Sequence, residues 1–489
     1  MPPRRIKDSD ANIQTLLAPY NPWWGDTLFP TTPPPAFRRP VFARIHADLH
    51  GIKQVISITG PRRVGKTTLV RQLVEELLHE GVDPARIVYF SMDDPLLYRE
   101  PYRERFFDLL VGWLGAKPRH EGEPHFVFLD EIQRYDRWEL FLKKYYDLGY
   151  PLRFVISGSA SSPIFKKSRE SLLGRVKDFH VLPFSFREYV LYHRREDPLV
   201  LAYLDSAARE GAAFRDSLET DEPNMAKVLL PSTPTARLDE SFRALLGDYF
   251  VEGGFPETWE ILDLVRKQEY LYDNQVQKVI FEDLVLATEF RKPENIKAFY
   301  LSLIEQPGRE LSLERAAEEL GVSRPMLEKY FPLLEMTDLV KRLPQFSKRV
   351  LKVRRGNVKC YLVDLALRNA VLKLGRRVLD DSVTLGQYAE NIVFNTLSRW
   401  PGVVSLSYYR DRGRGGKETD FVVTLGGGRY LGIEVKYRRT LDDLGGLHYF
   451  LEQFPKSFGL VVSMNAQEFR EERIACVPLH LFLLGMAQE

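Results

Sequence analysis

A glycine-containing loop between an apolar strand and a helix constrains the fold of this chain more than any other feature. Residues 60–67 read Gly-Pro-Arg-Arg-Val-Gly-Lys-Thr, and they join an apolar run at residues 55–58 to a helical pattern at residues 68–74. Glycines at these positions let backbone N–H groups curl around phosphate oxygens at the positive end of a helix. The pattern predicts a parallel α/β sheet with a phosphate-binding loop after its first strand.

The polar residues of this loop have distinct expected roles. Lys66 is expected to reach the β- and γ-phosphates of ATP, and the Thr67 hydroxyl is expected to bind Mg²⁺. ATP and Mg²⁺ are therefore the expected cofactors of this part of the chain. The residues expected to contact the nucleotide are Gly60, Arg63, Gly65, Lys66, Thr67 and Thr68.

A second motif favours hydrolysis of the nucleotide. The apolar run 126–129 ends in Asp130 and Glu131, which places one carboxylate near Mg²⁺ and the next where it can activate water. Asp130 is thus a predicted metal ligand, and Glu131 is the predicted base. Ser159, at the end of another apolar strand, is a candidate sensor of the γ-phosphate, although an ordinary turn serine fits equally well.

Strands and helices alternate along residues 54–192. Apolar strand patterns occur at residues 55–58, 87–90, 126–129 and 154–156, with helical stretches between them. This alternation predicts a parallel sheet covered by helices. Residues 205–240 mix alanine, charge and proline, and we expect an irregular insertion or linker there.

Composition is that of a soluble globular protein with several domains. Of its 489 residues 44% are apolar and 28% are charged, and the net charge of +2 indicates no particular partner. The only cysteines, Cys360 and Cys476, are far apart in sequence, which excludes a disulfide framework and a cysteine-rich zinc site. The N-terminus lacks an apolar signal core and no run approaches membrane-spanning length, so we expect a cytoplasmic protein with no membrane partner.

Two short helical patterns joined by Gly321-Val-Ser323 predict a helix-turn-helix with Ser312 and Ser323 as N-caps. Strand patterns at residues 339–343 and 359–363 then complete a winged helix around a basic block. The block suits a polyanion, with an exposed basic hairpin without ligand as the alternative. For the winged helix, DNA binding is one interpretation and a packing module is the other. The eight basic residues of the block, with no acid among them, are Lys341, Arg342, Lys348, Arg349, Lys352, Arg354, Arg355 and Lys359.

A predicted hairpin near the C-terminus gathers charged residues on one face. Alternating apolar residues lie on both sides of three consecutive glycines. If the turn centres on Gly427, Asp420 lies opposite Glu434, and Glu418 lies opposite Lys436. Facing carboxylates repel unless a cation holds them, and a divalent metal with a lysine is the set used for phosphodiester hydrolysis. A solvated charged strand face is the alternative.

Glu390 is a third candidate ligand of that metal. It lies on the predicted helix 384–400 and points toward the apolar side, where an unpaired carboxylate is costly. A glutamate near water at the edge of the apolar stripe is the alternative. Asp420 and Glu434 are expected to hold one or two Mg²⁺ or Mn²⁺ ions with help from Glu390, while Lys436 orients the water or stabilises developing charge.

Together these motifs resemble an archaeal and bacterial family of AAA+-like P-loop ATPases with a winged helix and a C-terminal nuclease-like domain of the PD-(D/E)XK type. The resemblance covers nearly the whole chain and implies nucleotide-driven assembly into a homo-oligomeric ring, with a hexamer favoured. It also implies that Arg175 lies near a neighbour's ATP as an arginine finger, whereas spacing alone fits a surface arginine equally. The family's serine-rich sensor segment leaves Ser157 as the alternative to Ser159. The matching motifs are residues 21–24, 60–68, 129–133, 157–159, 174–176, 183–188 and 253–257.

The leading hypothesis is an ATPase that remodels or moves along DNA and carries a metal-dependent DNA nuclease domain. An ATP-gated switch that binds DNA or a partner without cutting, and a structural ATP-dependent assembly, are the alternatives. The expected fold class is a multidomain α/β protein with a P-loop AAA+-like parallel sheet, a winged helix and a restriction-endonuclease-like domain. The expected segments are an extended arm (1–48), the ATPase core (49–200), an insertion and helical lid or linker (201–303), the winged helix (304–363) and the nuclease-like domain (364–489).

Overall fold

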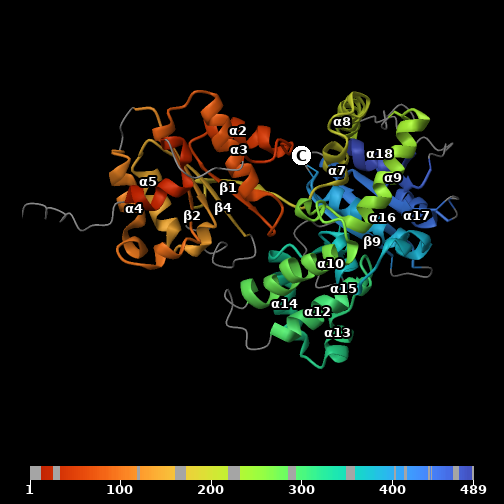
Figure 1. Cartoon of the computed structure of the whole chain (residues 1–489). Coiled ribbons are helices and arrows are strands. Elements are labelled where there is room, and N and C mark those ends of the chain that lie inside the picture. The colour runs from red at the N-terminus through yellow and green to blue at the C-terminus, as the bar shows by residue number, and fades with distance from the viewer. Residues whose placement is uncertain are drawn as a thin grey trace, which may run out of the picture. The chain divides into compact units, whose positions relative to one another are not determined.

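Two compact units make up the chain, and Figure 1 labels the elements of both. Unit 1 comprises Met1–Leu182 with Leu286–Glu289, and unit 2 comprises Pro183–Val285 with Phe290–Glu489. The structure is a computed structural model. It describes residues 13–25, 33–117, 122–159, 172–218, 232–284, 293–347, 358–400, 403–411, 416–438, 441, 443–465 and 473–486.

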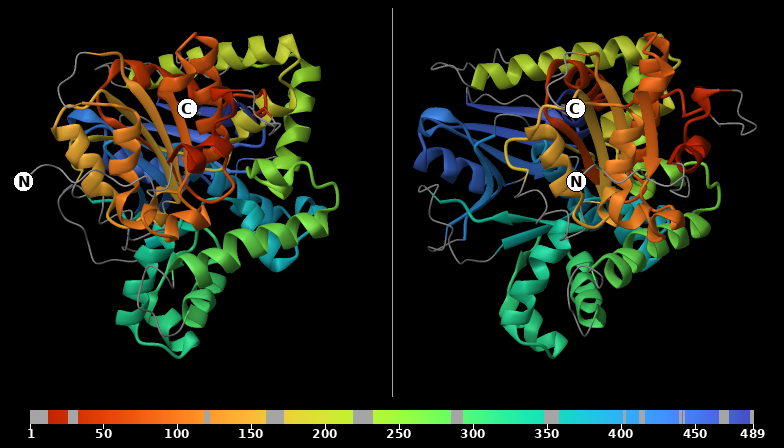
Figure 2. Two further views of the ribbon diagram at one scale, coloured as in Figure 1. Left: turned by 60° about the vertical axis from the view of Figure 1, so that its left-hand side comes forward. Right: turned by 90° about the vertical axis from the view of Figure 1, so that its left-hand side faces the viewer.

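Unit 1 is built on a five-stranded parallel sheet, which two further views show in Figure 2. The strand order is β2-β3-β4-β1-β5, and the four strands predicted from apolar runs are all present and pair in parallel. Helices α3, α4 and α5 connect or follow the strands, as expected for alternating strand and helix patterns. The elements are β1 (Val55–Gly60), α3 (Lys66–His79), β2 (Ile87–Ser91), α4 (Tyr102–Trp113), β3 (His125–Asp130), α5 (Trp138–Asp147), β4 (Leu152–Ser159) and β5 (Val176–His180).

The N-terminal arm is not extended where the structure describes it, which corrects the expectation from sequence. It forms the helices α1 (Ile13–Leu17) and α2 (Val41–Gly51), with single 3-10 turns between residues 18 and 24. The side chain of Asn21 is fully buried and exchanges hydrogen bonds of 2.7 and 2.8 Å with the backbone of Tyr89. The Trp23 indole donates to the carbonyl of Ile87 at 3.0 Å. The arm thus bonds to backbone N–H and C=O groups at the open edge of β2. The proline and tryptophan content of the arm did not reveal this tertiary contact.

Unit 2 begins with helices in a region that we expected to be irregular. Residues 205–218 continue the helix α8 (Pro198–Leu218), and residues 236–240 open the helix α9 (Ala236–Glu252), so the expectation of an irregular stretch is wrong for these residues. A Cβ atom at Gly211 would lie 1.9 Å from the carbonyl oxygen of Gly485, so small residues allow α8 to cross α18 (Leu479–Met486) closely. The buried side of α8 has helical spacing: Val200, Leu204, Ala207, Gly211, Phe214 and Leu218.

The middle of unit 2 contains three helices and a small antiparallel sheet in the order β6-β8-β7. Ser312 caps α13 by accepting a hydrogen bond from the backbone of Arg315 at 3.4 Å. Ser323 occupies the N-cap position of α14, but its side chain makes no capping hydrogen bond. One of the two predicted caps is therefore confirmed. The elements are α12 (Pro293–Glu305), β6 (Glu310–Leu311), α13 (Leu313–Leu320), α14 (Arg324–Met336), β7 (Val340–Pro344) and β8 (Val358–Leu362).

The C-terminal part of unit 2 is a mixed five-stranded sheet in the order β13-β12-β11-β10-β9. Strands β9, β10 and β11 are antiparallel, whereas β11, β12 and β13 are parallel. Phe421 packs in the core that includes α16, and its neighbour Val422 packs in the core that includes α17, as the alternation of a strand requires. The elements are α16 (Ser382–Leu397), β9 (Ser405–Arg410), β10 (Glu418–Thr424), β11 (Tyr430–Lys436), α17 (Gly445–Gln453), β12 (Phe458–Ser463) and β13 (Ile474–Pro478).

Among the helices that the structure describes, none combines the length and the apolar character needed to cross a bilayer.

Candidate functional site

The phosphate-binding loop leaves the carboxyl end of β1 along a path that requires glycine. Gly60 has a φ of +144°, and a Cβ atom there would lie 1.9 Å from the carbonyl oxygen of Val181. Gly65, directly before α3, has a φ of +94°. Residues with side chains rarely adopt these values. The strand, loop and helix therefore follow one another as predicted, with both glycines where the backbone needs them.

Lys66 is the first residue of α3, and its side chain is buried beside the loop. Its ammonium donates to the carbonyl oxygens of Gly60 at 3.1 Å and Pro61 at 2.7 Å. Arg63, in the same loop, has a φ of +66°, and Thr68 lies half-buried in the first turn of α3. The cation is thus held at the helix N-terminus, where a phosphate group binds most favourably.

Three hydroxyl groups converge on Asp130 at the carboxyl end of β3. The Thr67 hydroxyl donates to Asp130 Oδ2 at 2.7 Å, and the Tyr89 hydroxyl donates to the same oxygen at 3.3 Å. The Ser157 hydroxyl donates to Oδ1. Burial and the charge of Asp130 raise the pKa of Tyr89, so this phenol stays a neutral donor. Thr67 and Asp130 are therefore in direct contact, and they are the residues that would hold a Mg²⁺ ion.

Glu131 and Ser159 lie at the same edge of the sheet. Glu131 has a left-handed backbone with a φ of +52°, and its Oε2 accepts a hydrogen bond from Gln133 at 2.5 Å. Ser159, the last residue of β4, is buried and lies opposite Gly60 in the strand register. Parallel strands present their carboxyl ends together, which is where such folds bind ligands. The fold thus gathers the predicted base and the predicted sensor beside the loop.

Arg175 lies at the opposite edge of the sheet. Its carbonyl oxygen accepts a hydrogen bond from Val55, the first residue of β1, whereas the phosphate-binding loop follows the last residue of that strand. Its guanidinium forms a bidentate pair with Asp147, at 2.6 Å from Nε to Oδ1 and 3.2 Å from Nη2 to Oδ2. Arg175 therefore lies away from the loop of its own chain and is paired with Asp147 there.

The C-terminal hairpin has the register expected from the sequence. Phe421 pairs with Ile433 and Val422 pairs with Gly432, which sets Asp420 opposite Glu434. The Asp420 carboxylate accepts a hydrogen bond from the backbone of Val435 at 2.9 Å. A short helical turn, Gly426–Gly428, closes the hairpin where the glycines indicated a turn. The two carboxylates predicted to share a metal are thus on neighbouring strands.

Lys359 is the residue of this site that sequence reasoning placed wrongly. We assigned it to an exposed basic block, but it is 4% exposed and its ammonium lies among carboxylates. Its Nζ is 2.8 Å from Glu418, 3.1 Å from Glu390 and 3.8 Å from Asp420. Burial by itself lowers the pKa of this lysine, but the surrounding carboxylates outweigh burial and raise it, so Lys359 is charged. No feature of the sequence distinguished it from its basic neighbours.

Glu390 reaches the cluster from α16, as its place on the helix suggested. Its Oε1 accepts hydrogen bonds from Lys359 at 3.1 Å and from the Tyr361 hydroxyl at 2.6 Å. Burial raises the pKa of Glu390, and the positive charge of Lys359 acts in the opposite direction. Gly308 leaves room for this carboxylate, because a Cβ atom there would lie 3.2 Å from Oε1. Glu390 thus bonds to β8 rather than remaining at the edge of the helix near water.

Glu434 is the carboxylate of the cluster whose charge is least balanced. Its Oε1 is 2.7 Å from Lys436 Nζ, but its Oε2 is buried without a hydrogen-bond partner. Burial and the nearby charge of Asp420 raise the pKa of Glu434 to about 8, although Lys436 acts in the opposite direction. An orphaned carboxylate oxygen of this kind is a feature that a bound cation satisfies.

The carboxylates of this cluster do not converge on one point. Among the described residues, the acidic cluster has no three side chains whose ligand atoms all lie within 4.8 Å of one another. The group that meets this distance is in unit 1. The chemistry of the orphaned Glu434 Oε2, a carboxylate oxygen, fits a hard divalent cation such as Mg²⁺ or Mn²⁺. The residues that would hold it are Asp420 and Glu434.

The basic block is less exposed than its sequence indicated, in the part that the structure describes. Lys341 is half-buried, and burial lowers its pKa. Arg342 pairs with Glu335 at 2.5 Å, and Lys359 belongs to the acidic cluster. The other five basic residues (Lys348, Arg349, Lys352, Arg354 and Arg355) lie outside the described residues.

Three segments of the chain match protein families. Residues 52–190 match the family described as an AAA domain, and this match covers the sheet, the phosphate-binding loop and the Asp130 motif. Residues 243–377 match a domain of unknown function, DUF8612, and residues 385–482 match another, DUF4143. The match and the loop geometry together identify an AAA-type domain that binds and hydrolyses ATP.

Two relatives and one solved structure align with most of the chain. The uncharacterized protein MJ1637 of Methanocaldococcus jannaschii is 25% identical over 345 residues, which are 70% of this chain and 67% of that protein. An uncharacterized protein of Haemophilus influenzae is 23% identical over 75% of this chain and 78% of its own length. The solved structure of the Walker-type ATPase PABY2304 of Pyrococcus abyssi is 16% identical and has a TM-score of 0.37, with 71% of this chain and 99% of that chain covered.

Proposed function

We propose that this chain couples ATP hydrolysis in unit 1 to metal-dependent cleavage of DNA at the acidic cluster of unit 2. The observation that carries the nuclease part is the orphaned, buried Glu434 carboxylate beside Asp420 and Lys436. Burial and the nearby charge of Asp420 favour the protonated form of this carboxyl, whose pKa is raised to about 8. A divalent cation beside Oε2 would favour the ionised form and give this oxygen a partner.

In the ATP site, the residues of the chain position the nucleotide and the water. Thr67 and Asp130, whose side-chain oxygens are 2.7 Å apart, would hold a Mg²⁺ ion, which would supply positive charge to the phosphates. Glu131 accepts the proton of the water that attacks the γ-phosphorus, and ADP leaves with the electrons of the broken P–O bond. Ser159 is the proposed sensor of the γ-phosphate at the end of β4.

In the acidic cluster, Asp420 and Glu434 would hold a divalent cation, which lowers the pKa of a bound water and neutralises charge on the phosphate. Lys436 supplies a fixed positive charge 2.7 Å from Glu434. It orients the attacking water or stabilises the charge that develops on phosphate oxygens. Glu390 positions this face of the sheet through its bonds to Lys359 and Tyr361.

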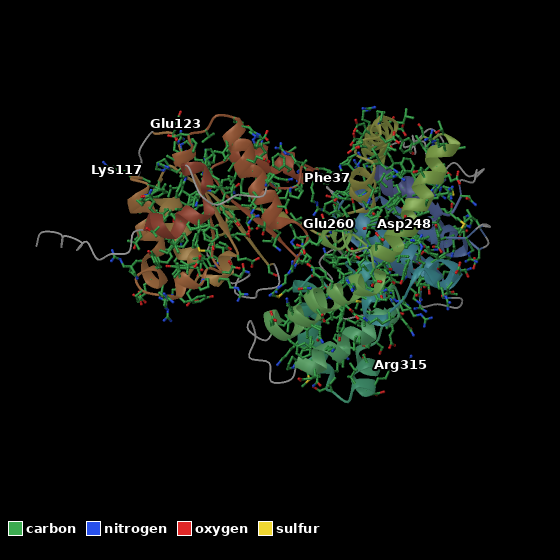
Figure 3. All side chains as sticks on the ribbon, viewed as in Figure 1. Phe37, Lys117, Glu123, Asp248, Glu260 and Arg315 are labelled. Carbon is green, nitrogen blue, oxygen red and sulfur yellow. The ribbon has the colours of Figure 1, made fainter. Side chains whose placement is uncertain are left out.

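DNA is the proposed substrate because residues 341–355 contain seven basic residues and no acid; the eighth, Lys359, is buried in the acidic cluster and is not counted. The helix α14, which precedes this basic segment, offers little free positive charge of its own. Its exposed Arg324 is paired with Glu314 and, at 2.9 Å, with Glu328. Arg315 of α13 also faces outward (Figure 3). The proposed winged helix therefore binds the phosphate backbone chiefly through the basic block rather than reading bases with α14.

Assembly into a ring is proposed from the position of Arg175. This residue lies at the sheet edge away from its own loop and pairs with Asp147 there. An arginine that contacts the γ-phosphate of a neighbour would make hydrolysis depend on assembly. A homo-oligomer, with a hexameric ring favoured, is the proposed active form.

A second candidate function is a switch that binds DNA or a partner without cutting. The observation that favours it is Lys359, whose ammonium already balances Glu390, Glu418 and Asp420. A lysine in this position competes with a metal for the same carboxylates. In this case the cluster links β8 to the mixed sheet, and ATP turnover changes binding only.

One experiment separates the two candidates. The full chain is incubated with supercoiled, single-stranded and branched DNA, with Mg²⁺ or Mn²⁺ and with or without ATP. Wild type is compared with Asp420→Asn, Glu434→Gln and the exposed control Glu452→Gln. Cleavage by wild type and the control that is lost in both cluster variants, with ATP turnover retained, supports the nuclease. Equal products from wild type and Asp420→Asn reject it, and DNA binding without cleavage in all four proteins supports the switch.

A further inference from the structure

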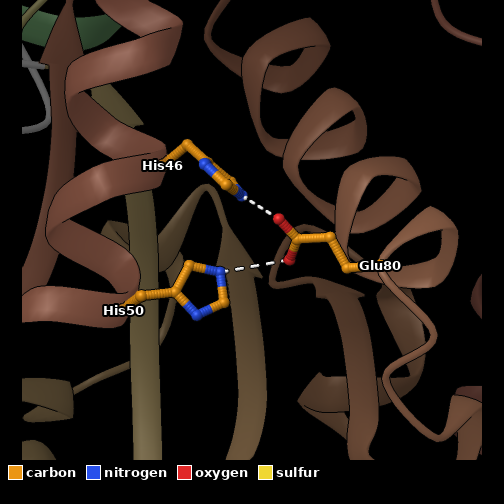
Figure 4. Close-up of side chains that lie close together, drawn as sticks. All are labelled: His46, His50 and Glu80. Atoms are coloured by element: carbon orange, nitrogen blue, oxygen red, sulfur yellow. Dashed lines mark ion pairs between the residues drawn. The ribbon is translucent and has the colours of Figure 1, made fainter.

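Two histidines and a glutamate come together on one side of unit 1, away from the sites described so far. His46 and His50 lie four residues apart on α2, so both project from the same face of that helix. Glu80 follows the last residue of α3 and turns its carboxylate toward them (Figure 4). One nitrogen or oxygen atom of each side chain can be chosen so that all three lie within 4.8 Å of one another.

The distances in this group are those of ligands around one small ion. His46 Nε2 is 2.8 Å from Glu80 Oε1, and His50 Nε2 is 3.2 Å from Oε2. Two bonds of about 2.0 Å at a tetrahedral angle place the ligand atoms about 3.3 Å apart. The three side chains therefore need little movement to accept a metal.

The contact of His46 is close without being a hydrogen bond. Its Nε2 is shielded from solvent and has no hydrogen-bond partner, although Glu80 Oε1 is 2.8 Å away. A ring N–H that bonded to this oxygen would point at it. In a metal site, by contrast, the nitrogen lone pair points at the ion rather than at the neighbouring ligand. The misaligned approach thus favours a shared ion over a simple pairing.

Neighbouring side chains hold the ring of His46 in place. Phe42 stacks on His46 with an interplanar angle of 9° and centroids 6.0 Å apart. Arg38 covers Phe42 at 4.5 Å and is paired with Glu76 at 2.5 Å. The His46 ring is therefore held in place before any ion binds, and such support raises the affinity of a ligand.

We propose that His46, His50 and Glu80 bind a zinc-class transition-metal ion that links α2 to the end of α3. Imidazole and carboxylate ligands suit Zn²⁺ and its first-row neighbours, whereas Mg²⁺ and Ca²⁺ prefer oxygen alone. Three protein ligands leave a fourth position for water. Because α3 begins with Lys66 of the phosphate-binding loop, the ion fixes the far end of the helix that carries this loop.

The test measures Zn²⁺ and Co²⁺ binding to the tag-free full chain without nucleotide. Calorimetry gives the affinity for Zn²⁺, and the visible absorption of Co²⁺ reports a four-coordinate site. The variants are His50→Ala and Glu80→Gln, with His79→Ala as the control because this exposed histidine precedes Glu80 and is not in the group. We expect one Zn²⁺ per chain, a rise in melting temperature with Zn²⁺, and affinity lowered about 100-fold or more in both ligand variants.

Excess Mg²⁺ should leave the Co²⁺ spectrum unchanged, because the site is not built from oxygen alone. Circular dichroism of each variant without metal confirms that the fold is intact. Absence of Zn²⁺ binding by wild type overturns the proposal, and so does unchanged affinity in His50→Ala and Glu80→Gln. Equal weakening in His79→Ala also overturns it, since binding would then be distributed over surface histidines.

Discussion

Lys359 and Glu390 form a buried ion pair, with 3.1 Å between Nζ and Oε1, that joins strand β8 to helix α16. Each partner is held by a second group, since Glu418 lies 2.8 Å from the lysine and Tyr361 donates to the glutamate at 2.6 Å. The pair therefore ties the small antiparallel sheet to the mixed sheet of unit 2. Its removal affects both the stability of this unit and the charge around Asp420.

Replacement of Lys359 by methionine should destabilise unit 2 strongly. The substitution keeps most of the volume but leaves the buried carboxylates without their cation, which costs about 3–5 kcal/mol when one partner of a buried pair is removed. Urea unfolding at neutral pH measures this loss. The double variant Lys359→Met with Glu390→Gln should recover part of it, because one buried charge is then removed as well.

The exposed Lys329 on α14 provides the matched control, and Lys329→Met should leave the free energy of unfolding nearly unchanged. A Lys359→Met protein as stable as wild type would mean that the ion pair has no energetic role.

The stability of unit 2 should depend on pH through Glu434. The folded-state pKa of this group is about 8, against 4.5 for an ordinary glutamate, so the folded chain retains a proton that the unfolded chain releases. The stabilising contribution of the protonated group is complete below about pH 4.5 and is lost as the pH rises through about 8. Glu434→Gln should remove this dependence and should raise the free energy of unfolding near pH 8.

The measurement is urea unfolding of wild type and Glu434→Gln at several pH values across this window. A divalent cation at the cluster adds a second expectation, because Mn²⁺ favours the ionised carboxylate and should stabilise wild type most near pH 8. Mn²⁺ should stabilise Glu434→Gln much less. Identical pH profiles for the two proteins would contradict the raised pKa, whatever the cleavage assays give.

Lys66→Ala should abolish ATP turnover without unfolding unit 1. The motif assigns this ammonium to the β- and γ-phosphates, and loss of such a contact costs roughly 100-fold or more in rate. Initial rates of phosphate release measure the effect, with melting temperature as the check on folding. The exposed Lys177→Ala on β5 is the control and should turn over ATP as wild type does.

Arg175→Ala should reduce ATP turnover but leave ATP affinity nearly unchanged, because the residue lies away from the loop of its own chain. A mixture of Arg175→Ala and Lys66→Ala subunits tests the arginine finger more directly. In mixed assemblies, the Lys66→Ala subunit supplies Arg175 to the intact ATP site of an Arg175→Ala neighbour. Turnover by the mixture should exceed that of either variant alone, and simple additivity would argue against an arginine finger.

The parallel sheet and the hairpin register were predictable because both depend on local patterns. Apolar runs of strand length, separated by helical stretches, indicated four of the strands of unit 1. Three glycines between alternating strands centred the turn, and the observed pairing of Phe421 with Ile433 follows from that centre. In each case the residues that determine the structure are close together in sequence.

The helix α8 and the N-terminal arm were not predictable in the same way. Gly211 of α8 packs against the backbone of Gly485, and Asn21 and Trp23 are fixed by hydrogen bonds to β2. These partners are far away along the chain. The mixed composition of both segments did not reveal these contacts and therefore gave the wrong structure.

The sequence by itself determined the phosphate-binding loop, the Asp130 motif and the pairing of Asp420 with Glu434, since local spacing controls all three. Tertiary structure decided that Lys359 is buried among carboxylates and that His46 and His50 meet Glu80. It also decided that the Ser157 hydroxyl donates to Asp130. The physical reason is that burial and charge pairing depend on which distant side chains share a low-dielectric space, and only the folded chain brings those side chains together.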